Sequence, residues 1–137
     1  TSMIDKRIAQ CISDFALFPS WEEKYEHLIS LGQSLPMLDD MYKKDAYLIR
    51  GCQSQVWFRG YEKNGTIFFE GDSDALITKG IVALLIFVFS GATPKEIKEA
   101  NMDFLDTIEL RSHLSLSRAN GLSSMINHMK AFSERFI

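Results

Sequence analysis

The sequence has little cysteine and no long apolar run. Only two cysteines, Cys11 and Cys52, occur among its 137 residues, too few for the disulfide framework of a small secreted protein. The longest apolar run, residues 81–89, is much shorter than the roughly 20 residues that cross a bilayer. No charged-then-apolar segment typical of a secretion signal opens the chain. We therefore expect a cytoplasmic protein, with its thiols reduced and no membrane partner.

Positive charge and metal-binding patterns are scarce as well. Fifteen lysines and arginines against 18 aspartates and glutamates give a formal net charge of -3, and no basic run argues for a nucleic-acid partner. The three histidines and two cysteines lack the paired spacing of a zinc site. No glycine-rich phosphate loop and no Gly-x-Ser-x-Gly elbow are present. We therefore expect no metal, nucleotide or serine-hydrolase chemistry.

With 137 residues, 46% of them hydrophobic, the chain can form one substantial core, so we expect one domain over residues 1–137. Hydrophobic periodicity predicts that this domain is rich in helices. Apolar residues at three- and four-residue spacing, together with capping signals, predict helices over residues 4–15, 21–32, 74–89, 94–100 and 118–136. The predicted helix over residues 74–89 is apolar nearly all round in its second half, which is typical of a central, buried element.

A hairpin is predicted between the second and third helices, over about residues 54–71. Asn64-Gly65 suits the positive backbone angles of a tight hairpin turn. Pairing outward from this turn sets Arg59 opposite Glu70 and Tyr61 opposite Phe68, a charge pair and an aromatic pair. Residues 46–49 are expected to add a short strand. The predicted fold class is therefore α+β, with a small antiparallel sheet packed against several helices.

The two cysteines have different surroundings in the sequence. Cys11 lies on the apolar face of the first predicted helix, so we expect it to be buried and inert. Cys52 stands between Gly51 and the polar pair Gln53-Ser54, just before the hairpin. Its position alone leaves two interpretations open. Cys52 is either one more small buried hydrophobic residue, or a reactive group on a loop held by the rigid hairpin.

The motif around Cys52 resembles the cysteine loop of the SufE family. This motif is Gly51-Cys52-Gln53-Ser54-Gln55-Val56-Trp57. Further blocks resemble the same family in the same order: Trp21-Glu22-Glu23-Lys24-Tyr25, Leu35-Pro36, Gly71-Asp72-Ser73-Asp74-Ala75, His113-Leu114-Ser115 and Ser117-Arg118-Ala119-Asn120-Gly121-Leu122. The blocks span nearly the whole chain. The chain departs from the pattern at Leu116, where such proteins commonly carry a proline.

The resemblance implies a SufE/IscU-like fold and a role as sulfur acceptor. A protein of this kind receives persulfide sulfur from a PLP-dependent cysteine desulfurase of the SufS/CsdA kind, here on Cys52. It raises the turnover of the desulfurase and passes the sulfur on towards an iron–sulfur scaffold or another acceptor. PLP belongs to the desulfurase, so the resemblance implies no cofactor on this chain.

The chemistry of a single cysteine agrees with that role. One thiol suffices for sulfur transfer between persulfides, whereas an iron–sulfur cluster normally needs about four ligands. An unperturbed cysteine, with a pKa of about 8.5, is only a few per cent ionised at neutral pH. Either the site lowers the pKa of Cys52 or the partner supplies a base. We also expect Val56 and Trp57, which follow closely, to help enclose the loaded cysteine.

The resemblance names further residues that support Cys52 or dock a partner: Gly51, Gln53, Ser54, Asp74, His113 and Arg118. Arg118 is either a cation that stabilises the thiolate or binds a partner carboxylate, or an ordinary surface arginine. Gln53 either bonds the sulfur or shapes the loop. Asp74 is interpreted as a helix-end residue rather than a general base. His113 is a candidate base by residue type, with a packed histidine as the alternative.

Two other functions stay open at this point. The first is a stand-alone cysteine hydrolase or transferase in which Cys52 and His113 act together. The second is an interaction module whose cysteine is inert. The three functions differ in whether Cys52 gains a sulfur atom from a desulfurase.

Overall fold

The computed structural model describes residues 2–137 and has an α+β fold, as predicted. Its elements, in chain order, are α1 (Met3–Ala16), α2 (Trp21–Gln33), the 3₁₀ helices η1 (Asp40–Tyr42) and η2 (Asp45–Tyr47), β1 (Val56–Lys63), β2 (Thr66–Ser73), α3 (Leu76–Phe89), α4 (Pro94–Glu99), α5 (Phe104–Thr107), the 3₁₀ helix η3 (Arg111–His113) and α6 (Leu116–Glu134). The two strands form one antiparallel sheet.

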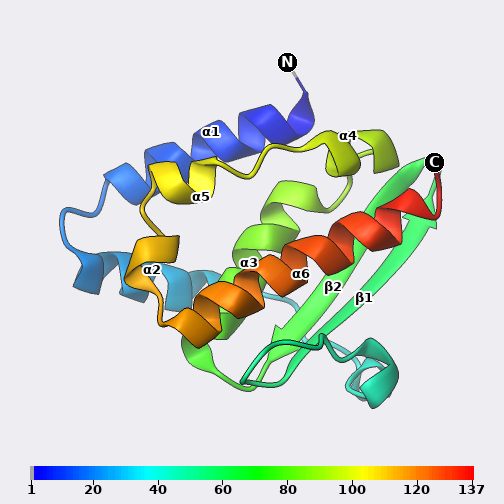
Figure 1. The fold of residues 1–137 in the computed structure, drawn as a ribbon, viewed down its shortest axis with the longest axis horizontal. Helices are drawn as coiled ribbons and strands as arrows, with labels where there is room; N and C mark the ends of the chain where they lie inside the picture. The colour runs from blue at the N-terminus through cyan, green and yellow to red at the C-terminus, as the bar shows by residue number, and fades with distance from the viewer. Residues whose placement is uncertain (1) are drawn as a thin grey trace.

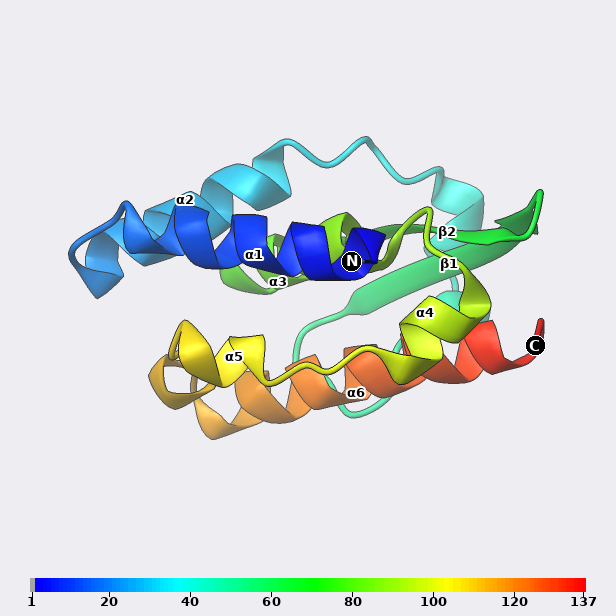
Figure 2. The same ribbon diagram turned by 90° about the horizontal axis from the view of Figure 1, so that it is seen from above.

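The helices and the hairpin are arranged around α3. Figure 1 shows α3 at the centre, with α6 crossing in front of it and the hairpin beside it. In Figure 2, α4, α5 and α6 form a layer separate from α1, α2, α3 and the hairpin. Helix α3 is buried on nearly all sides, including Ile81, Leu85 and Phe89, which are fully covered. Its apolar sequence is therefore explained by neighbours on most of its sides.

The hairpin has the predicted turn and register. Asn64 and Gly65 have positive φ angles of 54° and 81°, the conformation of a type I′ turn. Arg59 pairs with Glu70 and Tyr61 with Phe68, whose rings stack 5.5 Å apart. The opposite face of the ribbon carries Val56, Phe58, Ile67 and Phe69, all buried against the helices. The sheet thus has one core face and one partly exposed face of charged and aromatic residues.

The helix starts agree only in part with the predictions. Ser20 caps α2 and Thr93 caps α4, each accepting a hydrogen bond from the amide three residues on. The last helix starts earlier than predicted, at Leu116, because the Ser115 side chain caps it. The prediction that Asp74 caps the third helix is wrong: α3 starts at Leu76, and no side chain caps it.

The short strand expected at residues 46–49 is also wrong. Residues 45–47 form the 3₁₀ turn η2 instead. Only Leu48 makes an isolated bridge, to Trp57, and the Ile49 amide donates to the Val56 carbonyl at 2.8 Å. Residues 46–49 therefore make one bridge to the hairpin and then turn away from it, so they do not form a strand of the sheet.

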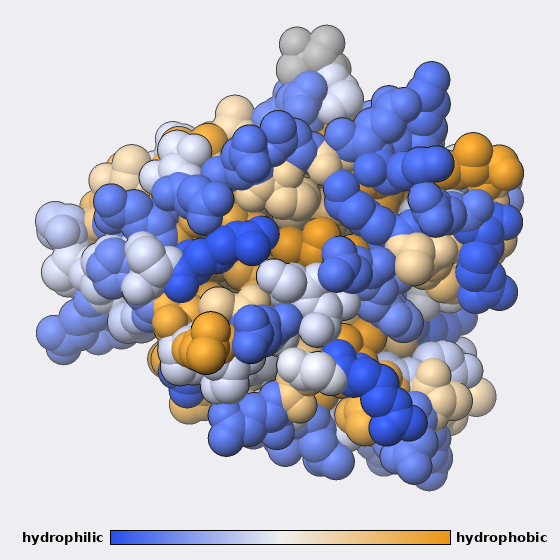
Figure 3. Space-filling model, viewed as in Figure 1, coloured by the Kyte–Doolittle hydropathy of each residue, from blue (hydrophilic) through white to orange (hydrophobic). Residues whose placement is uncertain are grey.

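The surface in Figure 3 is mostly hydrophilic, with apolar residues as separate spots. None of the helices in residues 2–137 is both long and apolar enough to cross a membrane.

Candidate functional site

Cys52 lies on the loop that connects η2 to β1. Gly51 precedes it with a φ of +86°, a conformation that side chains with a Cβ rarely adopt. A Cβ at Gly51 would also lie 2.6 Å from the Ser124 Oγ on α6. Glycine is therefore required at position 51 for two reasons: its backbone angle and the close approach of the loop to α6.

Hydrogen bonds hold both ends of this loop. At one end, the Ile49 amide donates to the Val56 carbonyl. At the other, the Gln55 amide donates to the Asp74 Oδ1 at 3.0 Å, and the Ser73 hydroxyl donates to the Gln55 carbonyl at 2.8 Å. Residues 50–54 thus form a short closed loop at the base of the hairpin, and Asp74 acts as a loop anchor rather than as a helix cap.

A cavity of about 300 Å³ opens beside Cys52. It lies where the loop meets the first turns of α3 and α6, which begin at the same end of the molecule in Figure 1. The residues that line it are Cys52, Gln53, Ser54, Thr78, Ile81, Ser115, Ser117, Arg118, Gly121 and Met125. The volume is several times that of a sulfur atom or a water molecule, which occupies about 30 Å³ in the liquid.

The thiol of Cys52 is half-buried against α6. Its Sγ donates a hydrogen bond to the Gly121 carbonyl at 3.7 Å. A Cβ at Gly121 would lie 3.2 Å from this sulfur, so the absence of a side chain there makes room for the thiol. Burial raises the pKa of Cys52 above its ordinary value. The possibility that the site by itself lowers the pKa of Cys52 is therefore wrong for the free protein.

Polar groups surround the mouth of the cavity. The Ser117 hydroxyl donates to the Gln53 Oε1 at 2.9 Å, which ties the cysteine loop to the start of α6. Gln53 therefore shapes the loop through its side chain. Arg118 lines the cavity and is exposed, and it forms no ion pair with another residue between 2 and 137. Its charge is available to an incoming anion.

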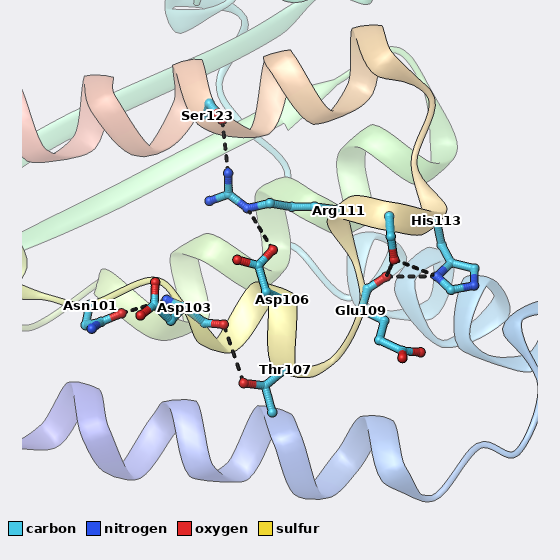
Figure 4. A network of polar contacts seen from close by, with 9 residues as sticks. Asn101, Asp103, Asp106, Thr107, Glu109, Arg111, His113 and Ser123 are labelled. Atoms are coloured by element: carbon cyan, nitrogen blue, oxygen red, sulfur yellow. Dashed lines mark hydrogen bonds and ion pairs between the residues drawn. The ribbon is translucent and has the colours of Figure 1, made fainter.

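His113 is placed elsewhere. Its ring stacks on Trp21 at 3.9 Å between centroids, and its Nδ1 lies 2.9 Å from the Glu109 carbonyl. Figure 4 shows it among the polar contacts of α5 and η3, where Arg111 reaches the Ser123 hydroxyl on α6. His113 does not line the cavity of Cys52. The structure thus brings together Cys52, Gln53, Ser54 and Arg118 at the cavity. Asp74 does not line the cavity but bonds the loop at Gln55, and His113 lies apart from both.

Six cavity residues have no counterpart among the residues proposed from the sequence. Thr78 and Ile81 come from α3, and the others from the start of α6: Ser115, Ser117, Gly121 and Met125. Ser115, Ser117 and Gly121 belong to blocks that resemble the SufE family, so only those blocks signalled them. The expectation that Val56 and Trp57 enclose the cysteine is wrong: Val56 lies in the core and neither residue lines the cavity. Strand alternation directs these side chains into the sheet's two faces instead.

Comparison with known proteins identifies the family of the chain. The SufE family, described as the Fe–S metabolism associated domain, matches residues 9–133. An uncharacterised SufE-like protein of Rhizobium meliloti (strain 1021) is 39% identical over 130 residues, which cover 91% of this chain and 93% of that protein. A solution structure of a hypothetical protein from Thermus thermophilus has the same fold, with a TM-score of 0.78, 17% identity and 94% of each chain covered. The chain therefore belongs to the SufE family, the family of the Fe–S metabolism associated domain.

Proposed function

We propose that this protein is a cytoplasmic sulfur acceptor that takes sulfur from a PLP-dependent cysteine desulfurase onto Cys52. It raises the turnover of the desulfurase by removing the sulfur, and it delivers the sulfur to iron–sulfur cluster assembly. The observation that carries the proposal is the position of Cys52 on a closed loop, half-buried in a cavity large enough for an added sulfur atom. Membership of the SufE family supports the same role.

The transfer is an exchange between a thiol and a persulfide. The Cys52 thiolate attacks the outer sulfur of the partner's cysteine persulfide, and a new S–S bond forms at Cys52. The S–S bond of the partner breaks, and its electron pair leaves with the partner's inner sulfur, which takes up a proton. One thiol and one persulfide give one thiol and one persulfide, so there is no net oxidation.

The raised pKa assigns part of the work to the partner. In the free protein, burial disfavours the thiolate of Cys52, and the cavity residues include no histidine or carboxylate to act as base. Docking must therefore supply the base or move the thiol to a place where its charge is better solvated. A cysteine that is unreactive until docking is suited to a carrier whose persulfide would otherwise react with small thiols.

The surface beside the cavity is suited to docking. Leu76 and Leu116 begin α3 and α6, and they are 64% and 78% exposed. They neighbour the cavity residues Thr78, Ser115 and Ser117 in the chain. Exposed leucines beside an unpaired Arg118 provide an apolar contact and a charge for a partner at the same end of the molecule.

The experiment is mass spectrometry after incubation with a cysteine desulfurase and cysteine. We expect the unmodified chain to gain the mass of one sulfur atom and to lose it on reduction. The Cys52→Ser variant should gain no mass. Cys11→Ala is the matched control, because Cys11 is buried in the core and should leave loading unchanged. Loading of Cys52→Ser equal to that of the unmodified chain contradicts the proposal.

The same experiment separates the two other functions. A stand-alone cysteine hydrolase is not favoured, because His113 does not line the cavity of Cys52; such an enzyme turns over a small substrate without a desulfurase. If the protein is instead an interaction module, its Cys52→Ser variant keeps the full effect on the desulfurase. Run against several desulfurases, the assay also identifies the partner.

A further inference from the structure

The first turn of α3 differs chemically from those of the other long helices. Helices α1, α2 and α6 each begin with a serine whose side chain accepts an amide hydrogen bond, whereas Ala75 precedes α3 and no side chain caps it. The amides of Leu76, Ile77 and Thr78 have no hydrogen-bond partner within residues 2–137. Free amides at a helix start carry partial positive charge, which attracts anions.

Thr78, in this turn, also has an unused hydroxyl. It is 5% exposed and lines the cavity of Cys52, yet its hydroxyl makes no hydrogen bond to any residue in the described chain. Two other cavity hydroxyls are engaged, because Ser117 donates to Gln53 and Ser115 accepts from the Arg118 amide. The hydroxyl of Ser54, which is less buried than Thr78, makes no hydrogen bond within residues 2–137. The Thr78 oxygen is not closed off from the cavity, so the hydroxyl is free to donate to a ligand bound there.

The size and lining of the cavity restrict that ligand. Ile81 and Met125 are at most 1% exposed and form an apolar wall next to Thr78. The charged side chain that lines the cavity is Arg118 on α6. A negative, weakly hydrated atom fits between an apolar wall, a free hydroxyl and a helix start, and in such surroundings each hydrogen bond to it is strengthened.

Loading of Cys52 puts such an atom in this cavity. In a persulfide the outer sulfur stands about 2.05 Å from the Sγ, and the cavity that Cys52 lines has room for it. A persulfide is a stronger acid than the corresponding thiol, so the outer sulfur carries the negative charge. After loading, the inner sulfur has no proton to donate to the Gly121 carbonyl, and the charged outer sulfur needs a donor of its own.

We propose that Thr78, with the uncapped first turn of α3, binds the outer sulfur of the persulfide on Cys52. The Thr78 hydroxyl donates a hydrogen bond to this sulfur and stabilises its anionic form, while Ile81 and Met125 keep water away. The inference rests on the proposed sulfur-acceptor function. It assigns to Thr78 a role in retaining the sulfur between loading and delivery, because an anionic outer sulfur is a poor target for attacking thiols.

The test compares Thr78→Val, which keeps the shape and removes the hydroxyl, with Thr78→Ser, which keeps the hydroxyl. Each full chain is loaded with cysteine persulfide as donor, and the loss of sulfur to dithiothreitol is followed by mass spectrometry. We expect loss from Thr78→Val to be about tenfold faster, the effect of losing one hydrogen bond to a charged acceptor. Thr78→Ser should stay close to the unmodified chain. The pH midpoint of the loss should rise by about one unit in Thr78→Val only.

Equal rates and equal pH midpoints for Thr78→Val and Thr78→Ser overturn the inference and leave the proposed function standing. Failure of the unmodified chain to gain sulfur on Cys52 overturns both. Circular dichroism checks that each variant is folded. Thr78→Ala, which also lacks the hydroxyl, gives the same comparison if Thr78→Val does not fold.

Discussion

Replacement of Gly121 with alanine tests how closely Cys52 is held against α6. The new Cβ would lie 3.2 Å from the Cys52 Sγ and 3.8 Å from its Cβ, whereas nonbonded carbon atoms settle at about 3.5–4.0 Å. The sulfur must therefore move by a few tenths of an ångström. It is on a loop beside an open cavity, so it has room to do so.

Two opposing effects decide the stability of Gly121→Ala. Alanine in a helix interior is favoured over glycine by about 0.8–1 kcal/mol, while an overpacked contact costs about 1–3 kcal/mol where the surroundings are rigid. Because the cysteine loop can shift, we expect the first effect to prevail or to cancel the second, so the free energy of unfolding should change by about 0–1 kcal/mol towards greater stability.

The reactivity of Cys52 should change more than the stability. A thiol displaced from α6 is less buried, so its raised pKa falls back towards its ordinary value. Well below the pKa, the thiolate fraction rises tenfold for each unit by which the pKa falls. We therefore expect alkylation of Cys52 by iodoacetamide at pH 7.5 to be faster in Gly121→Ala than in the unmodified chain.

A double-mutant cycle with Cys52→Ala isolates the contact. In the Cys52→Ala background the sulfur is absent, so only the helix propensity gain of about 0.8–1 kcal/mol should remain. Urea denaturation of the four chains gives the coupling between the two positions. An unchanged alkylation rate together with strictly additive stabilities would show that Cys52 does not rest on Gly121, and the geometry given for the site would be wrong.

Three further predictions concern residues away from the cavity floor. Leu116→Pro should raise the free energy of unfolding by about 0.4–1 kcal/mol, because Leu116 is the exposed first residue of α6 and Ser115 before it is extended; lower stability in urea contradicts this. Burial raises the pKa of Cys11 to about 12, so the folded chain keeps this proton when the unfolded chain has lost it, and stability should fall as the pH rises from about 8.5 towards 12; Cys11→Val should reduce this fall. His113→Gln should leave sulfur loading of Cys52 unchanged, and a large loss of loading would revive the cysteine–histidine enzyme.

The parts of the fold that were predictable depend on neighbours in the sequence. The Asn64-Gly65 turn determines the register of its own hairpin, and Ser20 and Thr93 act on amides three residues away. The start of α3 was not predictable in this way, because the Asp74 side chain bonds the Gln55 amide across the loop instead of its own helix. Such competition between local and distant partners is decided only in three dimensions.

The candidate site, like the fold, was predictable only where neighbours in the sequence determine it. Cys52 and Gly51 stand out in the sequence because a motif surrounds them. Thr78 and Met125 do not, since each belongs to a helix whose apolar stripe explains it equally well as core. His113 was a reasonable candidate base by residue type, but its stacking on Trp21 depends on a contact between distant segments. Residue type indicates what a side chain can do, and packing determines what it faces.

The hydrogen bond between Ile49 and Val56 limits the reach of the cysteine. While this bond is intact, Cys52 is tethered three residues from Ile49, and a fully extended chain spans at most about 3.3–3.6 Å per residue. The Cα of Cys52 can therefore move no further than about 11 Å from that of Ile49. Under the proposed function, the sulfur donor must therefore bring its persulfide to the cysteine loop, because the loop itself can extend only this far.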